Sequence, residues 1–225
     1  RLRSRGLGDV YKRQSVDNAE WTQRLRYNAE EIRTRVDFTQ IPDIMKEAMI
    51  SIEDKRFYEH HGVDWKRTLG AVYGMATGND TAGGSTITQQ LIKNNIFSAE
   101  SENGLVDTFK RKFQEQYLAL ILEQSVDKDT ILQNYLNTIN LGNNNLGVQA
   151  AAQNYFNKDV SELTISESAV IAATTSNPYK YNPVRFPENN KTRRAIVLKN
   201  MLDQELISKA EYDEALADNV YDRIM

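Results

Sequence analysis

Apolar residues recur every three or four positions along most of this 225-residue chain, and this spacing is the strongest constraint on its fold. The clearest example is the segment 109–124. Its apolar side chains, which we expect to be buried, fall on one face of a helix: Phe109, Phe113, Tyr117, Leu120 and Ile121. The segment 127–137 repeats the spacing behind Asp127, which can cap a helix. The sequence therefore predicts a mainly α protein.

The same spacing predicts further helices at 15–32, 42–53, 63–73, 148–156, 163–175, 189–203 and 208–217. Glycine and asparagine gather at 74–84 and 140–147, and three of the four prolines at 177–187, so we expect loops there. Weak alternation at 33–38 predicts a short strand.

Composition bounds the class of protein. With 40% hydrophobic and 26% charged residues, the chain is an ordinary globular one, long enough for one large domain or two lobes. A net charge of −3 gives no overall attraction to nucleic acid, so any anion site must rest on a local basic cluster. The chain has no cysteine and only two histidines, His60 and His61, which excludes disulfides and disfavours a zinc site.

Two adjacent acids, Glu53 and Asp54, lie in the stretch SIEDKRFYEHHG at the end of a predicted helix. Glu53 continues the apolar stripe of Met45 and Met49, whereas Asp54 is turned about 100° away. Partial burial disfavours the charged form of a carboxylate and makes it a better proton acceptor near neutral pH. The alternative is an exposed acidic pair at a helix end.

The stretch GGSTITQQLIKN, residues 83–94, is dense in hydroxyls and amides, and Ser85 is placed to cap the helix that follows. Such groups suit sugar hydroxyls and phosphate oxygens, and Lys93 adds a cation. No Gly-Lys-Ser/Thr follows the glycines, so the stretch is not a Walker loop. The alternative is a threonine-rich turn before a helix.

A basic cluster opens the segment 109–124, where Lys110, Arg111 and Lys112 precede Glu115. Arg111 and Glu115 are spaced to share one side of a helix. The cluster is suited to a diphosphate, with a carboxylate beside it. The alternative is a solvated surface ion pair.

In order and spacing these stretches resemble the motifs of the peptidoglycan glycosyltransferase domain, family 51, of class A bifunctional penicillin-binding proteins. The resemblance covers about 36–201. It begins with Glu53, Asp54, Phe57, His60 and Gly62. It continues with GGSTITQQ at 83–90, with Lys93 and Asn94, with Arg111, Lys112 and Glu115, and with KDTILQNYLN at 128–137. Asp107 departs from the pattern, because the family often has arginine there; Lys110 is the nearest substitute.

The resemblance implies a lysozyme-like, mainly α fold with a large head lobe and a small membrane-facing jaw lobe. It places the glycosyltransferase domain at 36–205. Residues 15–35 are then an N-terminal linker or helix, and 206–225 a C-terminal helix or linker toward a transpeptidase domain. Residues 1–14 are expected to be non-native, because DVYKRQ at 9–14 resembles a translated sequencing adapter.

The implied reaction joins lipid II to a growing glycan chain with inversion at the anomeric carbon and release of undecaprenyl diphosphate. Glu53 would be the catalytic base. Lys93, Arg111 and Lys112 would neutralise the diphosphates. Glu115 would orient these cations or hold a divalent cation, Mg²⁺ or Mn²⁺, against the leaving group.

The remaining motif residues divide into two groups. Those expected to position sugars and phosphates are Ser85, Thr86, Thr88, Gln89, Gln90 and Asn94. The second group belongs to the substrate site but is expected mainly to shape and support it: Asp54, Phe57, His60, Tyr135 and Asn137.

The implied location is the extracytoplasmic face of the cell membrane, where an apolar patch, formed partly by the loop before Gly83, would contact the outer leaflet. Expected partners are lipid II, the growing glycan, other cell-wall synthesis proteins and the inhibitor moenomycin, and no nucleic acid.

Two other functions are open at this point. A lysozyme-like hydrolase would share the carboxylates but needs no basic cluster. An inactive module that only binds lipid-linked glycan would not need every motif carboxylate, and all are present here.

Overall fold

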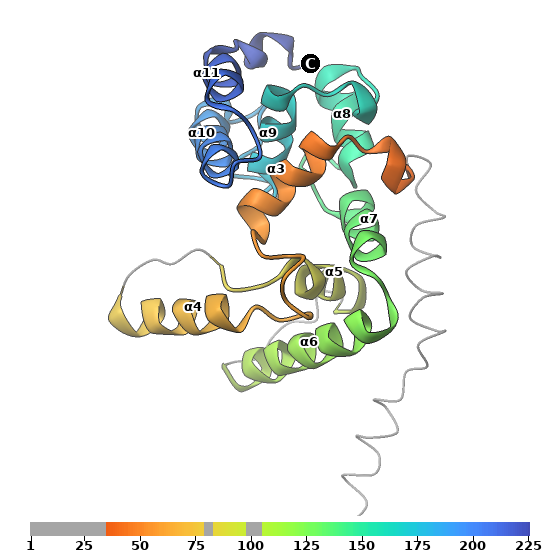
Figure 1. The fold of residues 1–225 in the computed structure, drawn as a ribbon, viewed down its shortest axis with the longest axis vertical. Coiled ribbons are helices and arrows are strands. Elements are labelled where there is room, and N and C mark those ends of the chain that lie inside the picture. Colours follow the sequence, from red (N-terminus) through yellow and green to blue (C-terminus); the bar gives the residue numbers. More distant parts are fainter. Residues whose placement is uncertain (1–34, 79–82, 98–104) are drawn as a thin grey trace, which may run out of the picture.

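The computed structural model describes residues 35–78, 83–97 and 105–225, and the regular structure of these residues is helical (Figure 1). The mainly α prediction is therefore confirmed. The predictions for 1–14 and for 15–34 lie outside the described residues. The elements are η1 Phe38–Gln40, α3 Asp43–Glu53, α4 Trp65–Thr77, α5 Ile87–Ile96, α6 Leu105–Ser125, α7 Lys128–Thr138, α8 Val148–Phe156, η2 Val160–Glu162, α9 Ile165–Thr174, α10 Pro187–Asp203, α11 Lys209–Ala217 and η3 Val220–Arg223.

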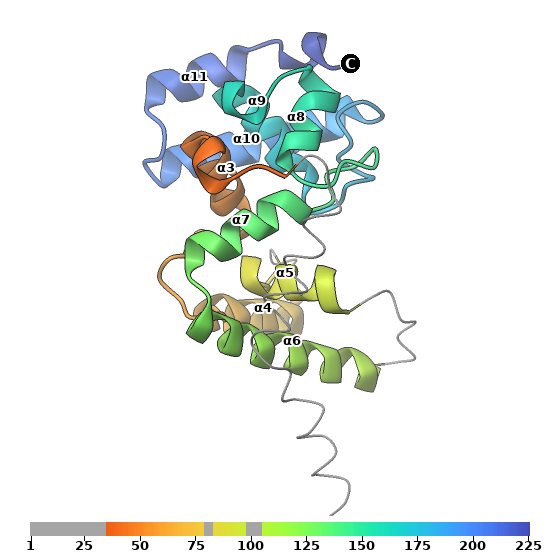
Figure 2. The ribbon, with the colours of Figure 1, turned by 90° about the vertical axis from the view of Figure 1, so that its right-hand side faces the viewer.

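The helices form two groups with α7 between them, as both views show (Figures 1 and 2). We call α3 and α8–α11 the upper lobe, and α4–α6 the lower lobe. Helix α9 packs against α3 and α10 in the upper lobe, and α5 packs against α6. Helix α7 packs against α5 on one side and α8 on the other, so it joins the lobes.

Helix α9 is the centre of the upper lobe. Thr164 caps its N-terminus by accepting a hydrogen bond from the Glu167 amide, and every residue from Ser166 to Thr174 is buried. A helix that is buried on all sides is held by packing along its whole length. It therefore gives α3, which packs against it, a rigid support.

Helix α6 corrects one prediction, because the aromatic stripe expected to be buried is exposed. Phe109 is 73%, Phe113 72% and Tyr117 41% exposed. Among the α6 side chains that the structure describes, the buried ones are instead Glu115, Ala119 and Leu122. Gly62 explains why the Ala119 face of α6 is the buried one. It has φ +85°, and a Cβ there would lie 2.5 Å from the Ala119 carbonyl, so only glycine allows the chain to approach α6 this closely. The chain after α3 therefore closes on the Ala119 side of α6.

Three local predictions are also wrong. Within the described residues 35–38 there is no strand, and Phe38 begins a 3₁₀ turn. Gly74 lies inside α4, which continues to Thr77, because a helix tolerates a glycine at a cost of about 1 kcal/mol. Thr86 rather than Ser85 caps α5, in a reciprocal pair with Gln89.

The end of the chain packs onto the upper lobe. Helix α11 contacts α9 and α10, and the Met225 amide donates to the Tyr155 carbonyl at 3.1 Å. In the described part of the chain, no helix is both long enough and apolar enough to cross a membrane.

Candidate functional site

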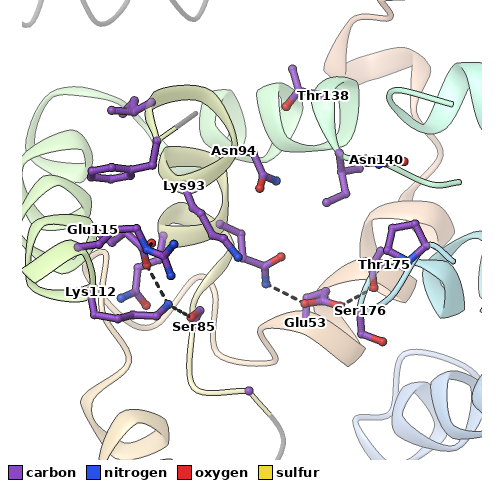
Figure 3. A pocket seen from close by; sticks show the side chains of 18 of the residues that line it. Glu53, Ser85, Lys93, Asn94, Lys112, Glu115, Thr138, Asn140, Thr175 and Ser176 are labelled. Atoms are coloured by element: carbon purple, nitrogen blue, oxygen red, sulfur yellow. Dashed lines mark hydrogen bonds and ion pairs between the residues drawn. The ribbon is translucent and has the colours of Figure 1, made fainter. Parts of the chain in front are cut away.

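A cleft of about 1660 Å³ lies between the lobes (Figure 3). Its walls come from α5 and α6 below and from α3, α10 and the chain following α7 and α9 above. It brings together nine of the residues that the motifs predicted: Glu53, Ser85, Gln89, Gln90, Lys93, Asn94, Arg111, Lys112 and Glu115.

Glu53 is the last residue of α3 and is only 8% exposed, so the alternative of an exposed acidic pair is wrong. Each of its carboxylate oxygens accepts a hydrogen bond. Gln90 Nε2 donates to Oε2 at 2.7 Å, and Thr175 Oγ1 donates to Oε1. The carboxylate is thus held in a fixed orientation at the cleft wall.

Tyr135 sets the orientation of Gln90. Its hydroxyl donates to Gln90 Oε1 at 3.2 Å, which leaves the amide nitrogen facing Glu53. Burial, together with the nearby charges of Glu53 and Asp54, raises the pKa of Tyr135 well above its ordinary value. The hydroxyl therefore stays protonated and remains a donor. Tyr135 acts from behind the cleft, because it is buried and does not line it.

Glu115 anchors the basic side of the cleft. It is fully buried, with Arg111 Nε at 3.1 Å and Lys112 Nζ at 2.8 Å from its two oxygens. Lys112 Nζ also donates to Ser85 Oγ at 3.1 Å. The alternative of a solvated surface pair is wrong, because a buried carboxylate fixes both cations at the cleft wall. Figure 3 shows this group on one side and Glu53 on the other, with Lys93 and Asn94 of α5 between them.

The other predicted site residues do not line the cleft: Asp54, Phe57, His60, Thr86, Thr88, Tyr135 and Asn137. Asp54 is fully buried and accepts from the Ile87 amide at 3.0 Å, at the N-terminus of α5. His60 Nε2 lies 2.9 Å from the same Asp54 oxygen. These contacts tie the end of α3 to the start of α5.

Similar supporting contacts hold the others. The Lys128 ammonium lies over the Phe57 ring, 4.5 Å from the ring centre. The hydroxyls of Thr86 and Thr88 donate to the Gly62 carbonyl and the Glu123 carboxylate. Asn137 pairs with both backbone groups of Val36, at 2.9 and 3.0 Å.

Several cleft residues were missed by the sequence reasoning. Thr175 and Arg67 both contact Glu53, the first at its carboxylate and the second at its backbone carbonyl. Neither belongs to a stretch whose composition drew attention. Lys110, which the sequence already offered as the substitute for the family's arginine, does line the cleft, 3.9 Å from Asp107.

The carboxylates fit a divalent cation poorly. Among the described residues, no group of three or more histidine, cysteine, aspartate or glutamate side chains is arranged to hold a metal. Glu115 is already paired with two cations, which would repel a third.

Comparison with known proteins identifies related sequences. A family model described as Transglycosylase matches residues 18–202. Penicillin-binding protein 1A of Neisseria lactamica is 43% identical over 191 residues, which is 83% of this chain and 23% of that protein. Penicillin-binding protein 1F of Bacillus subtilis (strain 168) is 46% identical over 182 residues, which is 80% of this chain and 25% of that protein. The chain thus spans about a quarter of these relatives.

A solved structure is also similar. The crystal structure of penicillin-binding protein 1A from Haemophilus influenzae matches 43% of this chain and 14% of that chain, with 47% sequence identity and a TM-score of 0.41.

Proposed function

Because this chain belongs to the transglycosylase family, we propose that it is a peptidoglycan glycosyltransferase of the class A penicillin-binding protein type. It would polymerise lipid II into β-1,4-linked glycan strands for the cell wall. The observation that carries the proposal is the division of the cleft: a fixed carboxylate, Glu53, on one side and the cations Lys93, Arg111 and Lys112 on the other.

The proposed step is a single displacement. Glu53 takes the proton of the acceptor's 4-hydroxyl as that oxygen bonds to the anomeric carbon of the donor. The bond from this carbon to the diphosphate oxygen breaks, and the electron pair leaves with the diphosphate. Attack from the opposite face inverts the anomeric centre. Glu53 suits the base role because its two donors hold the carboxylate toward the cleft.

The cations act on the leaving group. A diphosphate gains negative charge as its bond to the sugar breaks, and fixed ammonium and guanidinium groups stabilise this charge. Glu115 would keep Arg111 and Lys112 aimed at the diphosphate, since it binds both from the buried side. We assign it this role in preference to binding Mg²⁺ or Mn²⁺.

The same pairing disfavours hydrolysis of the lysozyme type. Such an enzyme needs a carboxylic acid that protonates the leaving oxygen. It also needs a second carboxyl group that acts as base or nucleophile, and Glu115, the other candidate, is occupied by ion pairs with two cations. Retention of both carboxylates in a formed cleft also disfavours a module that only binds glycan.

We also propose that the lower lobe contacts the outer leaflet of the cell membrane, where lipid II resides. Two sets of exposed apolar side chains support this, each spaced by four residues along a helix. They are Trp65, Leu69 and Tyr73 on α4, and Phe109, Phe113 and Tyr117 on α6. Other cell-wall synthesis proteins are further expected partners, to which we assign no surface.

The test is Glu53→Gln, assayed by polymerisation of labelled lipid II. The variant keeps the size of the side chain but cannot accept the proton, so the rate should fall by about 10²–10⁴-fold. Binding of moenomycin, an inhibitor that mimics the donor of this family, should be retained. Glu47→Gln is the matched control, because Glu47 is partly buried on the same helix but lies outside the cleft.

Two results would refute the proposal. A folded Glu53→Gln protein that polymerises within a few-fold of wild type would remove Glu53 from the base role. A wild-type protein that cleaves glycan strands but does not extend lipid II would be a hydrolase.

A further inference from the structure

Thr175 is held rigidly beside Glu53. It follows directly on α9 with helical backbone angles, and its amide donates to the Ala172 carbonyl. It is only 8% exposed and lines the cleft. Every residue of α9 from Ser166 to Thr174 is buried, so packing holds the backbone that carries the Thr175 side chain in place.

The Thr175 hydroxyl has one proton and two acceptors within reach. One is Glu53 Oε1 and the other is the Ala172 carbonyl oxygen, at 2.9 Å. A hydroxyl can donate to only one of them at a time. An ionised carboxylate is the stronger acceptor, so the proton faces Glu53 while Glu53 carries its charge.

Glu53 needs such a donor because of its place at the end of α3. The C-terminus of a helix carries partial negative charge, which disfavours a carboxylate there. Rotation of a carboxylate about its last torsion is also only weakly restricted by the side chain itself. A single donor, Gln90, would fix one oxygen and leave the plane of the group free to turn.

The donors to Glu53 come from opposite lobes. Gln90 belongs to α5 of the lower lobe, and Thr175 follows α9 of the upper lobe. The carboxylate is therefore hydrogen-bonded to both lobes, and its orientation depends on both (Figure 3).

We propose that Thr175 is a positioning residue for Glu53, an inference that rests on the proposed function. Its hydroxyl donates to Glu53 before the displacement and turns to the Ala172 carbonyl once Glu53 has taken the acceptor's proton. No bond to Thr175 breaks, and its proton is not transferred. The hydroxyl thus has an acceptor in both states of the base.

The experiment compares Thr175→Val, Thr175→Ser and Thr174→Val in lipid II polymerisation. Valine keeps the shape of threonine without the hydroxyl, and serine keeps the hydroxyl. Thr174 is the matched control, because it is buried at the same helix end and donates to the Val170 carbonyl but does not contact Glu53. We expect kcat of Thr175→Val to fall about 10- to 100-fold, the effect of one charge-assisted hydrogen bond, with KM within about twofold.

Thr175→Ser should restore kcat, and Thr174→Val should keep it. The inference is wrong if Thr175→Val keeps the wild-type kcat, or if Thr175→Ser is as impaired as the valine variant.

A second measurement is independent of activity. In crystals, the Glu53 carboxylate should leave its present orientation, or occupy two, in Thr175→Val and keep it in Thr175→Ser. An unchanged single orientation in the valine variant would overturn the inference even if the kcat of that variant falls. An inactive wild-type protein would refute the proposed function and leave this crystallographic comparison to decide the role of Thr175.

Discussion

Glu53 and Asp54 are adjacent in the chain, yet their carboxylates lie in different surroundings. Helix α3 ends at Glu53, and Asp54 takes the non-helical angles φ −161° and ψ 70°. This turn directs Asp54 to the first amide of α5, whereas Glu53 stays at the cleft. A single change of backbone conformation therefore separates a residue that supports the cleft from one that lines it.

At the residue scale, the basic wall can be tested with the double variant Arg111→Gln and Lys112→Gln. Removing two partly buried charge-assisted donors should weaken moenomycin binding by about 2–4 kcal/mol, measured by titration calorimetry. Part of the effect would arise because Glu115 is left buried with fewer partners.

Lys199→Gln is the control for this variant, because Lys199 forms an exposed pair with Asp203 on α10 and does not line the cleft. It should bind the inhibitor as wild type does. If the double variant also binds as wild type does, Arg111 and Lys112 do not hold a diphosphate.

At the element scale, α6 shows what periodicity can and cannot reveal. The spacing of Phe109, Phe113 and Tyr117 shows that one face of the helix is apolar. It does not show whether protein or lipid covers that face. The contact of Gly62 with the Ala119 backbone, 57 positions apart in the sequence, decides the matter, and no local pattern contains it.

The α6 stripe can be tested by replacing its three exposed aromatics with serine. Flotation with vesicles of phosphatidylglycerol and phosphatidylethanolamine should fall clearly, because apolar surface that would enter the bilayer is removed. Tyr179→Ser is the control, an exposed aromatic outside α4 and α6. A triple variant that floats as wild type does would exclude this stripe from lipid contact.

Helices whose ends are marked by a capping residue or a turn-forming residue could be predicted closely from the sequence. Helix α8 has the predicted bounds, and Asp127 caps α7 as expected, accepting from the Thr130 amide.

The site was predicted only in part. The motifs brought the right stretches together, but they could not separate Gln90, which lines the cleft, from Tyr135, which stands behind it. Thr175 was missed because its partner Glu53 lies 122 residues away.

At the scale of the whole molecule, a charged network joins the start of α9 to the C-terminal segment. Glu167 is buried and binds Lys158 at 2.9 Å and Arg223 at 3.2 Å, and Arg223 also binds Asp218 at 2.7 Å. Burial acts to raise the pKa of Glu167, but the Thr164 amide, Lys158 and Arg223 outweigh it and lower that pKa below 4.5. The hydrogen bond from Arg223 lowers the pKa of Asp218 below 3.8.

This network predicts an acid-dependent contribution to stability. Carboxyls with a lowered pKa in the folded state stabilise it fully above their unfolded values, 4.5 and 3.8, and lose this effect as the pH falls through their folded values. Arg223→Met should therefore lower the free energy of unfolding by about 0.5–1 kcal/mol at pH 7, since Arg223 is partly exposed. The difference from wild type should vanish near pH 2.

Urea unfolding at both pH values measures this difference. Lys209→Met, which removes an exposed pair with Asp213 on α11, is the control and should change stability less at pH 7. A loss of stability in Arg223→Met that is equal at both pH values would show that packing, and not charge, is what Arg223 contributes.

The separation of Glu53 from Asp54 also has an evolutionary consequence. A substitution of one nucleotide changes a glutamate codon to a glutamine codon, and at position 53 we expect the fold to survive it, because the hydrogen bond between Asp54 and the first amide of α5 remains. If Glu53 is the base, as proposed, loss of catalysis is one nucleotide change away and separable from loss of the fold. On the proposed function, a lineage could therefore lose polymerisation and keep the cleft, whereas a change at buried Asp54 would loosen the start of α5 as well.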